Sequence, residues 1–497
     1  MSRPNWALHE LFWDDPGMRV STRITGLTAD SRTVQPGDLF VAYPGLNSHG
    51  LDYVERAIEQ QAAVIVWQPS DAWDQLRVDR LSAQQSIPFR CYTALSANLG
   101  RLADRFFNHP SRHMAVVGVT GTNGKTSCVH FMASVLHQSA PCGMLGTLGN
   151  GLYGQTAASQ MTTADVVSVH RWMSKMQTDQ CAAVVMEVSS HALHQGRVDS
   201  VQYNVAILTN ISRDHLDYHG DMASYTRVKK QLFQQSNLDA VVINADDPAA
   251  DEFIAAVRPG VSIITFGLHA AKQTDAQHIW LHDVQLNPNG MNFKIFSSWG
   301  EGHISCVLFG VFNVMNLGAS LGALLALGMD FDLAIERLQG CITVPGRLAY
   351  YHTEGKPHVF VDYAHTPDAL AQSLRTLSDH FSGKRLCVFG CGGDRDRGKR
   401  ALMGAIAEKN AEKIILTDDN PRSEPGDEIV RQILSGVKHS NAIVVERDRA
   451  EAIRLAFKYA TSEDVILVAG KGHEDYQIVA HERLPFSDAQ VVQDCLQ

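Results

Sequence analysis

The sequence predicts an α/β protein of three domains: a small N-terminal α/β domain, a central domain with a mainly parallel sheet, and a C-terminal Rossmann-like domain. Two observations lead to this fold. The chain has 497 residues, which is enough for several domains that each bury a core of their own. Two series of apolar, β-branched runs also alternate with helix-length segments, as in parallel sheets. We therefore expect domains over residues 1–92, 93–340 and 341–497.

The expected elements follow in chain order. Residues 1–92 mix short strands with turns, and a run such as Asp38-Leu39-Phe40-Val41-Ala42 is typical of one of these strands. The central series of buried strands is expected at 114–119, 183–188, 205–208 and 240–243. Residues 270–310 are expected to form shorter, alternating strands with a hairpin turn at 287–290. After a hinge at 344–347, the C-terminal series is expected at 359–362, 386–389, 414–416 and 465–468.

The composition is that of an ordinary soluble enzyme, with 45% apolar and 19% charged residues. The chain has 53 acidic and 43 basic residues, a formal net charge of -10, which disfavours non-specific binding to nucleic acid or to an anionic membrane. No segment approaches the roughly 18 apolar residues that span a bilayer, and the first residues lack the apolar core of a signal peptide. We expect a cytoplasmic monomer whose nine scattered cysteines are reduced thiols.

A glycine-rich segment between a predicted strand and a predicted helix has the composition of a phosphate-binding loop. It reads Gly118-Val119-Thr120-Gly121-Thr122-Asn123-Gly124-Lys125-Thr126. Backbone N–H groups and the helix N-terminus would hold phosphates, Lys125 would meet the terminal phosphates, and the Thr126 hydroxyl would ligate Mg²⁺. The strict motif requires glycine at position 119, where this chain has valine. The alternative is a purely structural turn, which the combination of strand, Gly-Lys-Thr and helix disfavours. We therefore expect a central domain of the P-loop ATPase type.

The departure at Val119 points to one family. Gly-Thr-Asn-Gly-Lys-Thr at 121–126 resembles the nucleotide loop of the Mur ligase family, which also includes folylpolyglutamate synthetases. These enzymes activate a carboxylate with ATP and join it to an amine. The resemblance extends over most of the chain through several independent motifs. It implies an ATP site formed by Gly121, Thr122, Asn123, Gly124, Lys125, Thr126, Ser127, Asn244, Asn316 and Arg347.

Further segments resemble the family's divalent-metal ligands. Glu187 and His215, each after a predicted strand, match its acidic and histidine ligands, although an isolated acid there could equally be solvated. Lys229, in Tyr-x-x-x-Lys, matches the lysine that carries a carbamate, which would turn a cation into a carboxylate-like ligand. Considered alone, Lys229 would be a solvated helix lysine, and Lys230 is the alternative register. The resemblance implies a Mg²⁺ site of Thr126, Glu187, His215 and N6-carboxylated Lys229, with catalytic roles for Lys125, Lys229, His215 and Glu187.

The first domain and the segment after residue 160 resemble the acceptor site of the family branch that makes UDP-MurNAc-tripeptide. Asp30-Ser31-Arg32 resembles the grip of this branch on the uridine nucleotide. Met161 stands where the branch has Asn before a pair of threonines. Arg197 suits a phosphate or a carboxylate, because its guanidinium donates hydrogen bonds in pairs. The implied UDP-substrate site comprises Ser31, Leu46, Asn47, Ser48, Met161, Thr162, Thr163, Ser189, Gln195 and Arg197.

A polar loop after a C-terminal strand carries the expected amino-acid specificity. Asp419-Asn420-Pro421-Arg422 resembles the motif of those enzymes of the branch that add meso-diaminopimelate, whereas those that add L-lysine lack the arginine. Diaminopimelate differs from lysine by one carboxylate, which a guanidinium can bind through two parallel hydrogen bonds. The alternative is a polar surface turn with Arg422 in solvent. The implied amino-acid site comprises Arg395, Asp419, Asn420, Pro421, Arg422, Gly470 and Glu474.

The resemblance implies an ATP-dependent ligase of peptidoglycan precursor synthesis with Mg²⁺ as its cofactor. The expected substrates are ATP, UDP-MurNAc-L-Ala-D-Glu and meso-diaminopimelate, with an acyl phosphate formed at the D-Glu γ-carboxylate. The alternatives among ligases are an L-lysine-adding enzyme, another Mur ligase or a folylpolyglutamate synthetase. The alternative outside them is a non-catalytic nucleotide switch, which would need the phosphate loop but not Glu187, His215 and Lys229.

Overall fold

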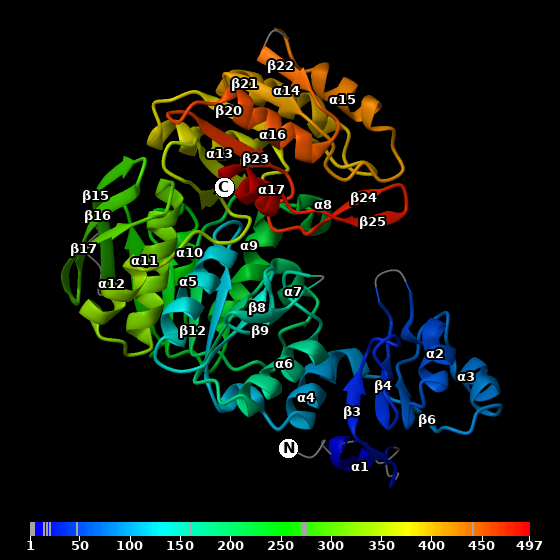
Figure 1. Cartoon of the computed structure of the whole chain (residues 1–497). Coiled ribbons are helices and arrows are strands. Elements are labelled where there is room, and N and C mark those ends of the chain that lie inside the picture. Colours follow the sequence, from blue (N-terminus) through cyan, green and yellow to red (C-terminus); the bar gives the residue numbers. More distant parts are fainter. Residues whose placement is uncertain are drawn as a thin grey trace. The chain divides into compact units, whose positions relative to one another are not determined.

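The computed structural model describes residues 5–12, 15, 18, 21–45, 48–159, 161–269, 276–439 and 442–497. The chain divides into two compact units, which are described separately (Figure 1). Unit 1 comprises Met1–Phe266, Gln273–Gln277 and Gly322–Met329, and unit 2 comprises Gly267–Lys272, His278–Leu321 and Asp330–Gln497. Both units contain parallel sheets with helices on their faces, which confirms the predicted α/β class. The domain boundaries expected after residues 92 and 340 stay predictions.

Unit 1 begins with a small, wholly parallel sheet in the order β3-β4-β5-β6. Its strands are β3 (Gly26–Thr28), β4 (Asp38–Ala42), β5 (Val64–Trp67) and β6 (Phe89–Cys91). Around them lie β1 (Trp6–Ala7), α1 (Leu8–Leu11), β2 (Arg23–Ile24), η2 (Gly50–Tyr53), α2 (Val54–Glu59) and α3 (Gln75–Ser82). Successive residues of β4 face opposite sides: Leu39 packs in one buried cluster with Leu99, and Phe40 packs in another with Trp67. The sheet is therefore covered on both faces.

The second sheet of unit 1 runs in the order β10-β9-β8-β11-β7-β12-β13-β14. Its parallel strands are β7 (Ala115–Thr120), β8 (Cys142–Gly146), β11 (Ala183–Glu187), β12 (Val205–Leu208), β13 (Ala240–Asn244) and β14 (Ser262–Gly267). Antiparallel β9 (Gly149–Leu152) and β10 (Gln155–Ala157) extend one edge. The four central strands expected from the sequence are thus confirmed within one or two residues.

The remaining helices complete unit 1, and several of them cover this second sheet. They are α4 (Leu95–Phe106), η3 (Pro110–Arg112), α5 (Lys125–His137), α6 (Val166–Thr178), α7 (Ser190–His194), α8 (Leu216–His219), α9 (Met222–Lys230), η4 (Gln231–Gln234) and α10 (Ala250–Ile254). Every residue of β11 is buried, including the acidic Glu187 at its end. Because parallel strands end at the same edge, the loops after β7, β11 and β12 meet there, and ligands bind at such edges in open α/β sheets.

Unit 2 contains an antiparallel sheet and a larger, mainly parallel sheet. The first consists of β15 (Gln277–Asn287), β16 (Gly290–Ser297) and β17 (Gly300–Cys306), beside α11 (Val311–Ala326) and α12 (Phe331–Gln339). Asn287 pairs with Gly290, which confirms the hairpin turn expected between them. His380 contacts this hairpin: its ring lies 2.9 Å from Asn287 O and accepts a hydrogen bond from Gly310 N at 2.8 Å.

The larger sheet of unit 2 has the order β18-β19-β23-β20-β21-β22, with β18 alone antiparallel. Its strands are β18 (Ala349–Tyr351), β19 (His358–Asp362), β20 (Arg385–Phe389), β21 (Lys413–Leu416), β22 (Ile443–Val445) and β23 (Val465–Ala469). The remaining elements are α13 (Pro367–His380), α14 (Gly398–Asn410), α15 (Gly426–Leu434), α16 (Arg449–Tyr459), β24 (Tyr476–Val479), β25 (Glu482–Pro485) and α17 (Asp488–Leu496). Separate buried clusters lie on its two faces, so its central strands are apolar throughout.

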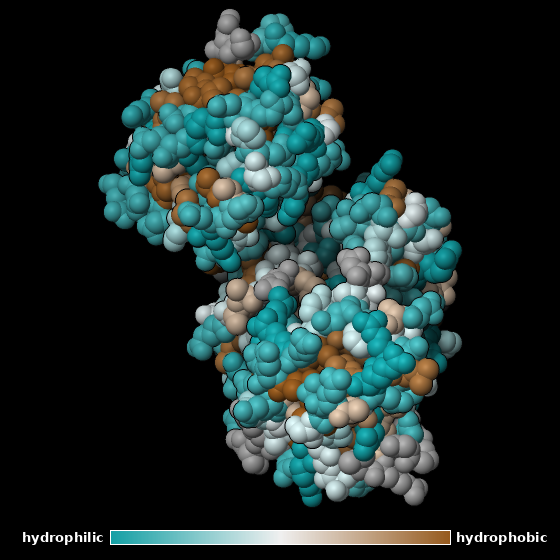
Figure 2. Space-filling view, turned by 90° about the vertical axis from the view of Figure 1, so that its right-hand side faces the viewer, coloured by the Kyte–Doolittle hydropathy of each residue, from teal (hydrophilic) through white to brown (hydrophobic). Residues whose placement is uncertain are grey.

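The described surface of the protein carries no single large hydrophobic patch on the face shown in Figure 2. The face shown in Figure 2 is mainly hydrophilic, and its hydrophobic residues form separate patches. The exposed large hydrophobic side chains come from distant parts of the sequence, as Leu76, Ile342 and Leu402 illustrate. Within the described ranges, no helix combines the length and the hydropathy that a membrane crossing requires.

Candidate active site

The glycine-rich loop of unit 1 joins the end of β7 to the start of α5, as predicted. Gly121 and Gly124 have φ angles of 145° and 86°, which glycine adopts readily. A Cβ atom at Gly121 would lie 1.9 Å from Thr209 Oγ1, so this position has no room for a side chain. The loop is fastened to the segment after β12, because Thr122 N donates to Asn210 O at 2.8 Å and Asn123 N donates to Asn210 Oδ1 at 3.0 Å.

Lys125 bends back over this loop at the start of α5. Its Nζ donates to Gly121 O at 2.8 Å and to Thr122 O at 2.7 Å. These two partners are neutral carbonyls of the loop, so the Lys125 amine lies directly at the loop backbone. Such an arrangement is suited to a polyphosphate. Ser127, also expected in the nucleotide site, is buried in the first turn of the same helix.

Thr126 and Glu187, which were expected to share a metal ion, lie in contact. Thr126 Oγ1 donates to Glu187 Oε2 at 3.0 Å, and Thr147 N donates to Glu187 Oε1 at 2.7 Å. Glu187 is only 2% exposed, so these bonds hold a carboxylate that has little water around it. A hydroxyl and a carboxylate are oxygen ligands of the kind that Mg²⁺ prefers.

Lys229 reaches the phosphate loop from α9. Its Nζ donates to Gly121 O at 2.8 Å and to Thr120 Oγ1 at 3.4 Å, and the side chain is buried. Burial, and after it the charge of Lys125, holds the pKa of Lys229 well below its ordinary value. Lys230 points elsewhere and pairs with Glu252 at 3.0 Å. The structure thus brings Lys229, not Lys230, to the loop.

His215 lies apart from these ligands in its described contacts. Its backbone is left-handed, with φ 53°, and its half-exposed ring is near Asp214, with Nε2 3.4 Å from Oδ2. The ring centroid is 4.8 Å from that of His191. Across the described ranges, no three His, Cys, Asp or Glu side chains are grouped closely enough to hold a metal ion. A metal site here would therefore depend on the Thr126 hydroxyl, on a modified Lys229 or on substrate oxygens.

A second polar cluster of unit 1 surrounds Arg197. Arg197 Nη1 donates to Thr163 O at 3.1 Å and to Met161 Sδ at 3.2 Å, and Nη2 donates to Gln195 Oε1 at 2.5 Å. Thr163 Oγ1 in turn donates to Glu187 O at 2.8 Å and accepts from Ser189 N at 3.2 Å. The expected acceptor residues 161, 163, 189, 195 and 197 are thus joined to the strand that carries Glu187. The Met161 sulfur is only a weak acceptor for the guanidinium.

The remaining acceptor residues are placed less completely. Thr162 Oγ1 accepts from Thr147 Oγ1 at 3.4 Å, which places it beside the Glu187 contact. Ser31 is buried between Asp30 and Arg32, which form a two-pronged ion pair. Ser48 Oγ accepts from Tyr53 Oη at 3.4 Å. Leu46 and Asn47 lie outside the described residues.

Tyr43 follows β4 and was not expected from the sequence. Burial raises its pKa, and Asp165 adds to the rise while Arg197 opposes it, so the phenol lies within electrostatic range of Arg197. Asn244, expected on the adenine side, ends β13; its Nδ2 donates to Thr209 O at 2.7 Å, next to the phosphate loop. The Asn244 bond joins the end of β13 to the segment beside the phosphate loop.

In unit 2, the loop after β21 meets the segment after β23. Asn420 Nδ2 donates to Glu474 Oε2 at 3.0 Å, and Asn420 Oδ1 accepts from Ile478 N at 2.8 Å. Lys471 completes this cluster: its fully buried Nζ contacts Glu474 Oε2 at 3.0 Å and Asn420 Oδ1 at 3.2 Å. Two expected amino-acid residues, Asn420 and Glu474, are therefore joined by a lysine that sequence reasoning missed, although it lies in the Gly-Lys-Gly-His-Glu segment.

The arginines expected in the amino-acid site lie on neighbouring loops. Arg422 has φ 52°, and its Nη1 donates to Gly393 O at 2.8 Å. The exposed Arg395 donates through Nη1 to Asp394 O at 3.0 Å. Within the described part of the chain, no carboxylate forms an ion pair with either of them. The bonds from Ser423 lower the pKa of Asp394, and the charge of Arg422 adds to this effect, so Asp394 lies within electrostatic range of Arg422. Neither guanidinium has a carboxylate of the described residues in direct contact, so both can bind an anionic ligand.

The other residues of this expected site are close-packed. Asp419 is 8% exposed, and a Cβ atom at Gly470 would lie 2.6 Å from its Oδ2. Pro421 is buried, and a Cβ atom at Gly393 would lie 1.9 Å from its carbonyl oxygen. Glycine at 393 and 470 thus permits the loops to approach each other this closely.

Asn316 and Arg347 were expected in the nucleotide site and belong to unit 2. Asn316 is buried, and its Nδ2 donates to Asn313 Oδ1 at 3.0 Å. The Arg347 guanidinium lies over the ring of Tyr363, 5.2 Å from its centroid. Their combination with the phosphate loop of unit 1 stays a prediction.

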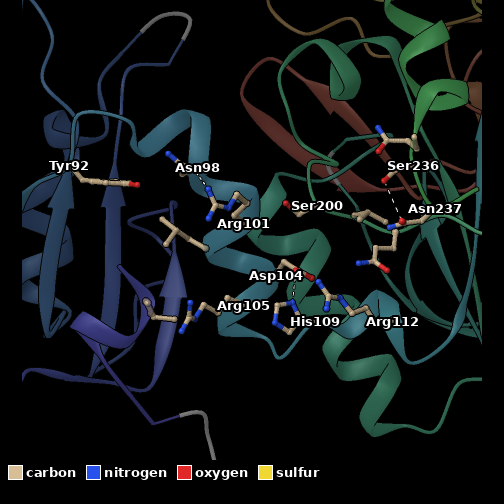
Figure 3. A pocket seen from close by; sticks show the side chains of 15 residues that line it. Tyr92, Asn98, Arg101, Asp104, Arg105, His109, Arg112, Ser200, Ser236 and Asn237 are labelled. Atoms are coloured by element: carbon tan, nitrogen blue, oxygen red, sulfur yellow. Dashed lines mark hydrogen bonds and ion pairs between the residues drawn. The ribbon is translucent and has the colours of Figure 1, made fainter. Parts of the chain in front are cut away.

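A cavity of about 350 Å³ in unit 1 lies away from the expected sites (Figure 3). Arg101, Arg105 and Arg112 line it together with Asp104 and His109, whose side chains pair at 2.6 Å. Its lining includes no residue of the predicted ATP, acceptor or metal site. This cavity therefore does not mark the active site.

Three family models match the chain. They are the Mur ligase family catalytic domain over residues 23–93, the Mur ligase middle domain over 119–324 and the Mur ligase glutamate ligase domain over 346–472. Curated relatives named UDP-N-acetylmuramoyl-L-alanyl-D-glutamate--2,6-diaminopimelate ligase cover nearly the full length. The Coxiella burnetii protein is 42% identical over 95% of this chain and 96% of its own. The protein of Xanthomonas oryzae pv. oryzae strain MAFF 311018 is 45% identical over 100% and 98%.

Solved structures also resemble the chain over most of its length. A structure titled with the same ligase name superimposes with a TM-score of 0.71 at 31% identity and covers 99% of both chains. A MurF structure from Acinetobacter baumannii has a TM-score of 0.67 at 18% identity and covers 100% of both chains. Folylpolyglutamate synthase from Mycobacterium tuberculosis has a TM-score of 0.60 at 19% identity, over 80% of this chain and 95% of its own. The last two likenesses concern the fold alone.

Proposed function

Because the chain belongs to the Mur ligase family, we propose that it is an ATP-dependent ligase that joins 2,6-diaminopimelate to UDP-MurNAc-L-Ala-D-Glu in peptidoglycan precursor synthesis. The name shared by its full-length relatives supports this pair of substrates. We expect the meso isomer to be the amine substrate, and ADP and phosphate to be the other products. We also expect the active enzyme to be a cytoplasmic monomer.

The buried amine of Lys229 at the phosphate loop is the observation that carries this proposal. A nucleotide switch needs the loop, but it has no need for a second lysine that approaches Gly121 from another helix. Burial and Lys125 favour the neutral amine. A neutral amine can attack CO₂, so that an N–C bond forms, one proton is released and a carbamate results. The site is thus suited to the modification expected in this family.

The proposed reaction has two chemical steps. First, a γ-carboxylate oxygen of D-Glu attacks the γ-phosphorus of ATP, the bond to ADP breaks, and an acyl phosphate forms. Then the amine of diaminopimelate attacks the acyl carbon, loses a proton and displaces phosphate through a tetrahedral intermediate. Lys125 would stabilise the charge that spreads over the transferring phosphoryl group. The Arg197 cluster would hold the muramoyl-peptide part of the acceptor.

The residues around Glu187 fit Mg²⁺. The Thr126 hydroxyl and the Glu187 carboxylate already lie 3.0 Å apart, and a carbamate on Lys229 would supply further oxygens. His215 would be an additional ligand. Once bound, the ion would neutralise charge on the ATP phosphates.

The loop cluster of unit 2 fits a diaminopimelate molecule. Arg422 has a half-buried guanidinium that bonds a carbonyl, so a second carboxylate of the substrate can become its counter-ion. Arg395 is exposed on the neighbouring loop and can hold a substrate carboxylate. Glu474, which Asn420 and Lys471 hold through Oε2, can accept a bond from the distal amino group through its second oxygen. L-lysine would leave Arg422 without a counter-ion, which argues against a lysine-adding enzyme.

One assay tests the proposed function and its alternatives. Phosphate release from ATP is followed with UDP-MurNAc-L-Ala-D-Glu and a panel of meso-diaminopimelate, L-lysine, D-Ala-D-Ala and glutamate, and separately with a folate acceptor and glutamate. We expect release that requires both the acceptor and diaminopimelate. ATP hydrolysis without either substrate would support the nucleotide switch, whereas activity on a folate acceptor with glutamate would support folylpolyglutamate synthesis. Either result would overturn the proposal.

A further inference from the structure

Two loops at one edge of the larger unit 2 sheet carry the arginines expected to bind diaminopimelate. Residues 390–397 follow β20 and contain Arg395, and residues 417–425 follow β21 and contain Arg422. The two strands are parallel neighbours, so their loops leave the sheet side by side. The distance between the two guanidinium groups therefore depends on how these loops are held together.

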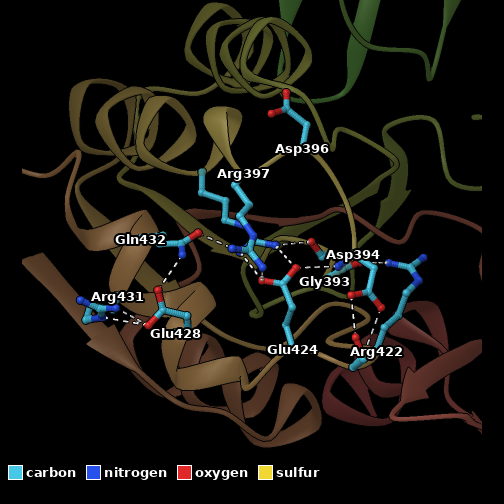
Figure 4. A network of polar contacts seen from close by, with 12 residues as sticks. Gly393, Asp394, Asp396, Arg397, Arg422, Glu424, Glu428, Arg431 and Gln432 are labelled. Carbon is cyan, nitrogen blue, oxygen red and sulfur yellow. Dashed lines mark hydrogen bonds and ion pairs between the residues drawn. The ribbon is translucent and has the colours of Figure 1, made fainter.

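Hydrogen bonds join the loops directly (Figure 4). Gly393 N donates to Asn420 O at 2.9 Å, and Asp394 N donates to Glu424 Oε1 at 2.7 Å. Ser423 Oγ donates to Asp394 Oδ1 at 2.7 Å. Each bond runs from one loop to the other, so the two loops hold each other in place.

Arg400 is the common partner of these contacts. It lies in the first turn of α14, and its side chain is completely buried. Nη1 and Nη2 donate to the two oxygens of Glu424, at 2.9 Å each, and Nη2 also donates to Gly392 O at 3.0 Å. Nη1 further donates to Gln432 Oε1 at 2.8 Å. One guanidinium therefore binds both loops and the helix α15.

We propose that Arg400 and Glu424 are positioning residues for the amino-acid substrate, because this buried ion pair sets the separation and orientation of Arg395 and Arg422. Arg400 cannot touch the substrate, since its side chain is fully buried. Arg422 lies two residues before Glu424 and has the left-handed φ of 52°, which requires support from its surroundings. The backbone of Arg422 is held by Ile478 O and Ala480 N on one side, and its guanidinium by Gly393 O on the other. Gly393 lies next to Gly392, whose carbonyl accepts from Arg400.

The pair has the geometry for this role. Two parallel bonds between a guanidinium and a carboxylate restrict both distance and orientation. The side-chain bond from Arg400, with the bond from Asp394 N, lowers the pKa of Glu424 to about 2, so the carboxylate stays charged at neutral pH. This inference rests on the proposed function, because Arg395 and Arg422 matter only if they bind the amino acid.

The test is a kinetic comparison of Glu424→Gln and Arg400→Lys with the wild-type enzyme. We expect KM for diaminopimelate to rise by roughly tenfold to 100-fold, since displacement of a binding group by about 1 Å can cost 10²-fold. ATP and the UDP-linked acceptor are expected to bind at other residues. Their KM values should therefore stay within a few-fold of those of the wild type. The preference for diaminopimelate over L-lysine should also fall. If the pair served stability alone, the variants would melt at a lower temperature, and KM for diaminopimelate would not rise selectively.

Two matched variants control for the loss of a polar contact. Gln432→Ala removes the α15 bond of Arg400 but leaves both loop bonds, and Glu412→Gln breaks the Arg385–Glu412 pair at the start of β20 and β21. Both should keep the wild-type KM for diaminopimelate. An unchanged KM in folded Glu424→Gln and Arg400→Lys overturns the inference, and so does failure of both to fold, because the pair then serves folding. If the wild type itself does not use diaminopimelate, the proposed function fails first.

Discussion

Replacing Lys229 with methionine should abolish ligase activity without unfolding the protein. The side chain is 1% exposed, and its amine donates to Gly121 O and Thr120 Oγ1. A carbamate cannot form on methionine, so we expect the rate to fall by at least about 100-fold, the usual effect of removing one charge-stabilising group. The matched control is Lys230→Met, which removes only a pair with Glu252, whose side chain is 63% exposed. The control should keep near wild-type activity.

The stability of Lys229→Met can also be worked out from the structure. The unfolded chain protonates this lysine at neutral pH, whereas burial and Lys125 favour the neutral amine in the folded protein. The unfolded state therefore binds more protons, and stability rises with pH between the lowered pKa and about 10.4. Each unit by which the pH lies below about 10.4, down to the lowered pKa, costs the wild type about 1.4 kcal/mol. Methionine removes this cost, and Gly121 O keeps the bond from Lys125 Nζ, so the loss of the Lys229 bond costs only about 0.5–1.5 kcal/mol.

The difference in unfolding free energy between Lys229→Met and the wild type should therefore shift in favour of Lys229→Met as the pH falls from 9 to 7. Urea unfolding of both proteins at these pH values, without bicarbonate or divalent ions, measures the difference. Short carboxylic acids should restore part of the activity of Lys229→Ala, because the shortened side chain leaves space for a carboxylate beside Thr120 and Gly121. Near wild-type activity of Lys229→Met, or equal losses in Lys229→Met and Lys230→Met, would refute the reasoning.

Three further predictions concern other residues. Lys125→Ala should lose turnover while its circular dichroism stays that of the wild type, and an unchanged kcat would remove Lys125 from the mechanism. Arg422→Gly should lose use of diaminopimelate but little stability, because relief of the left-handed φ, worth about 1–2 kcal/mol, offsets the lost side-chain bond; a strongly destabilised variant would contradict this. Because the pKa of Glu424 is lowered to about 2, its contribution to stability is complete above its unfolded pKa of about 4.3 and is lost as the pH falls toward 2. Between about pH 4.3 and about pH 2, Glu424→Gln should therefore lose less unfolding free energy than the wild type. Equal losses in the two proteins over this range would contradict the prediction.

The strands and the phosphate loop could be predicted because their signals are local. The run Ala183–Glu187 is buried at every position and apolar up to Met186, since both faces of the strand are covered. The loop at 121–126 needs glycine at fixed positions, and Gly121 has no space for a Cβ atom. The hairpin at Asn287 and Gly290 was likewise visible in the turn residues. In each case a few neighbouring residues determine the local structure.

Contacts between distant segments could not be predicted in this way. The choice between Lys229 and Lys230 depends on which side of α9 meets the loop, and only the fold shows that Lys230 pairs with Glu252. Lys471 and Arg400 look like surface cations in the sequence, yet both are buried because Glu474 and Glu424 compensate their charges. A single sequence contains no pairing signal for such ion pairs.

The most direct test of the account is the ratio of kcat/KM for meso-diaminopimelate to that for L-lysine in the wild-type enzyme. A site built around a substrate carboxylate rejects the analogue that lacks it by roughly 10⁴-fold, because its own charged group is left unpaired. Arg422 is placed for this role, with a half-buried guanidinium that bonds Gly393 O. We therefore predict a ratio near 10⁴ that collapses in Arg422→Gly. Comparable kcat/KM values for the two amino acids in the wild type would contradict the account.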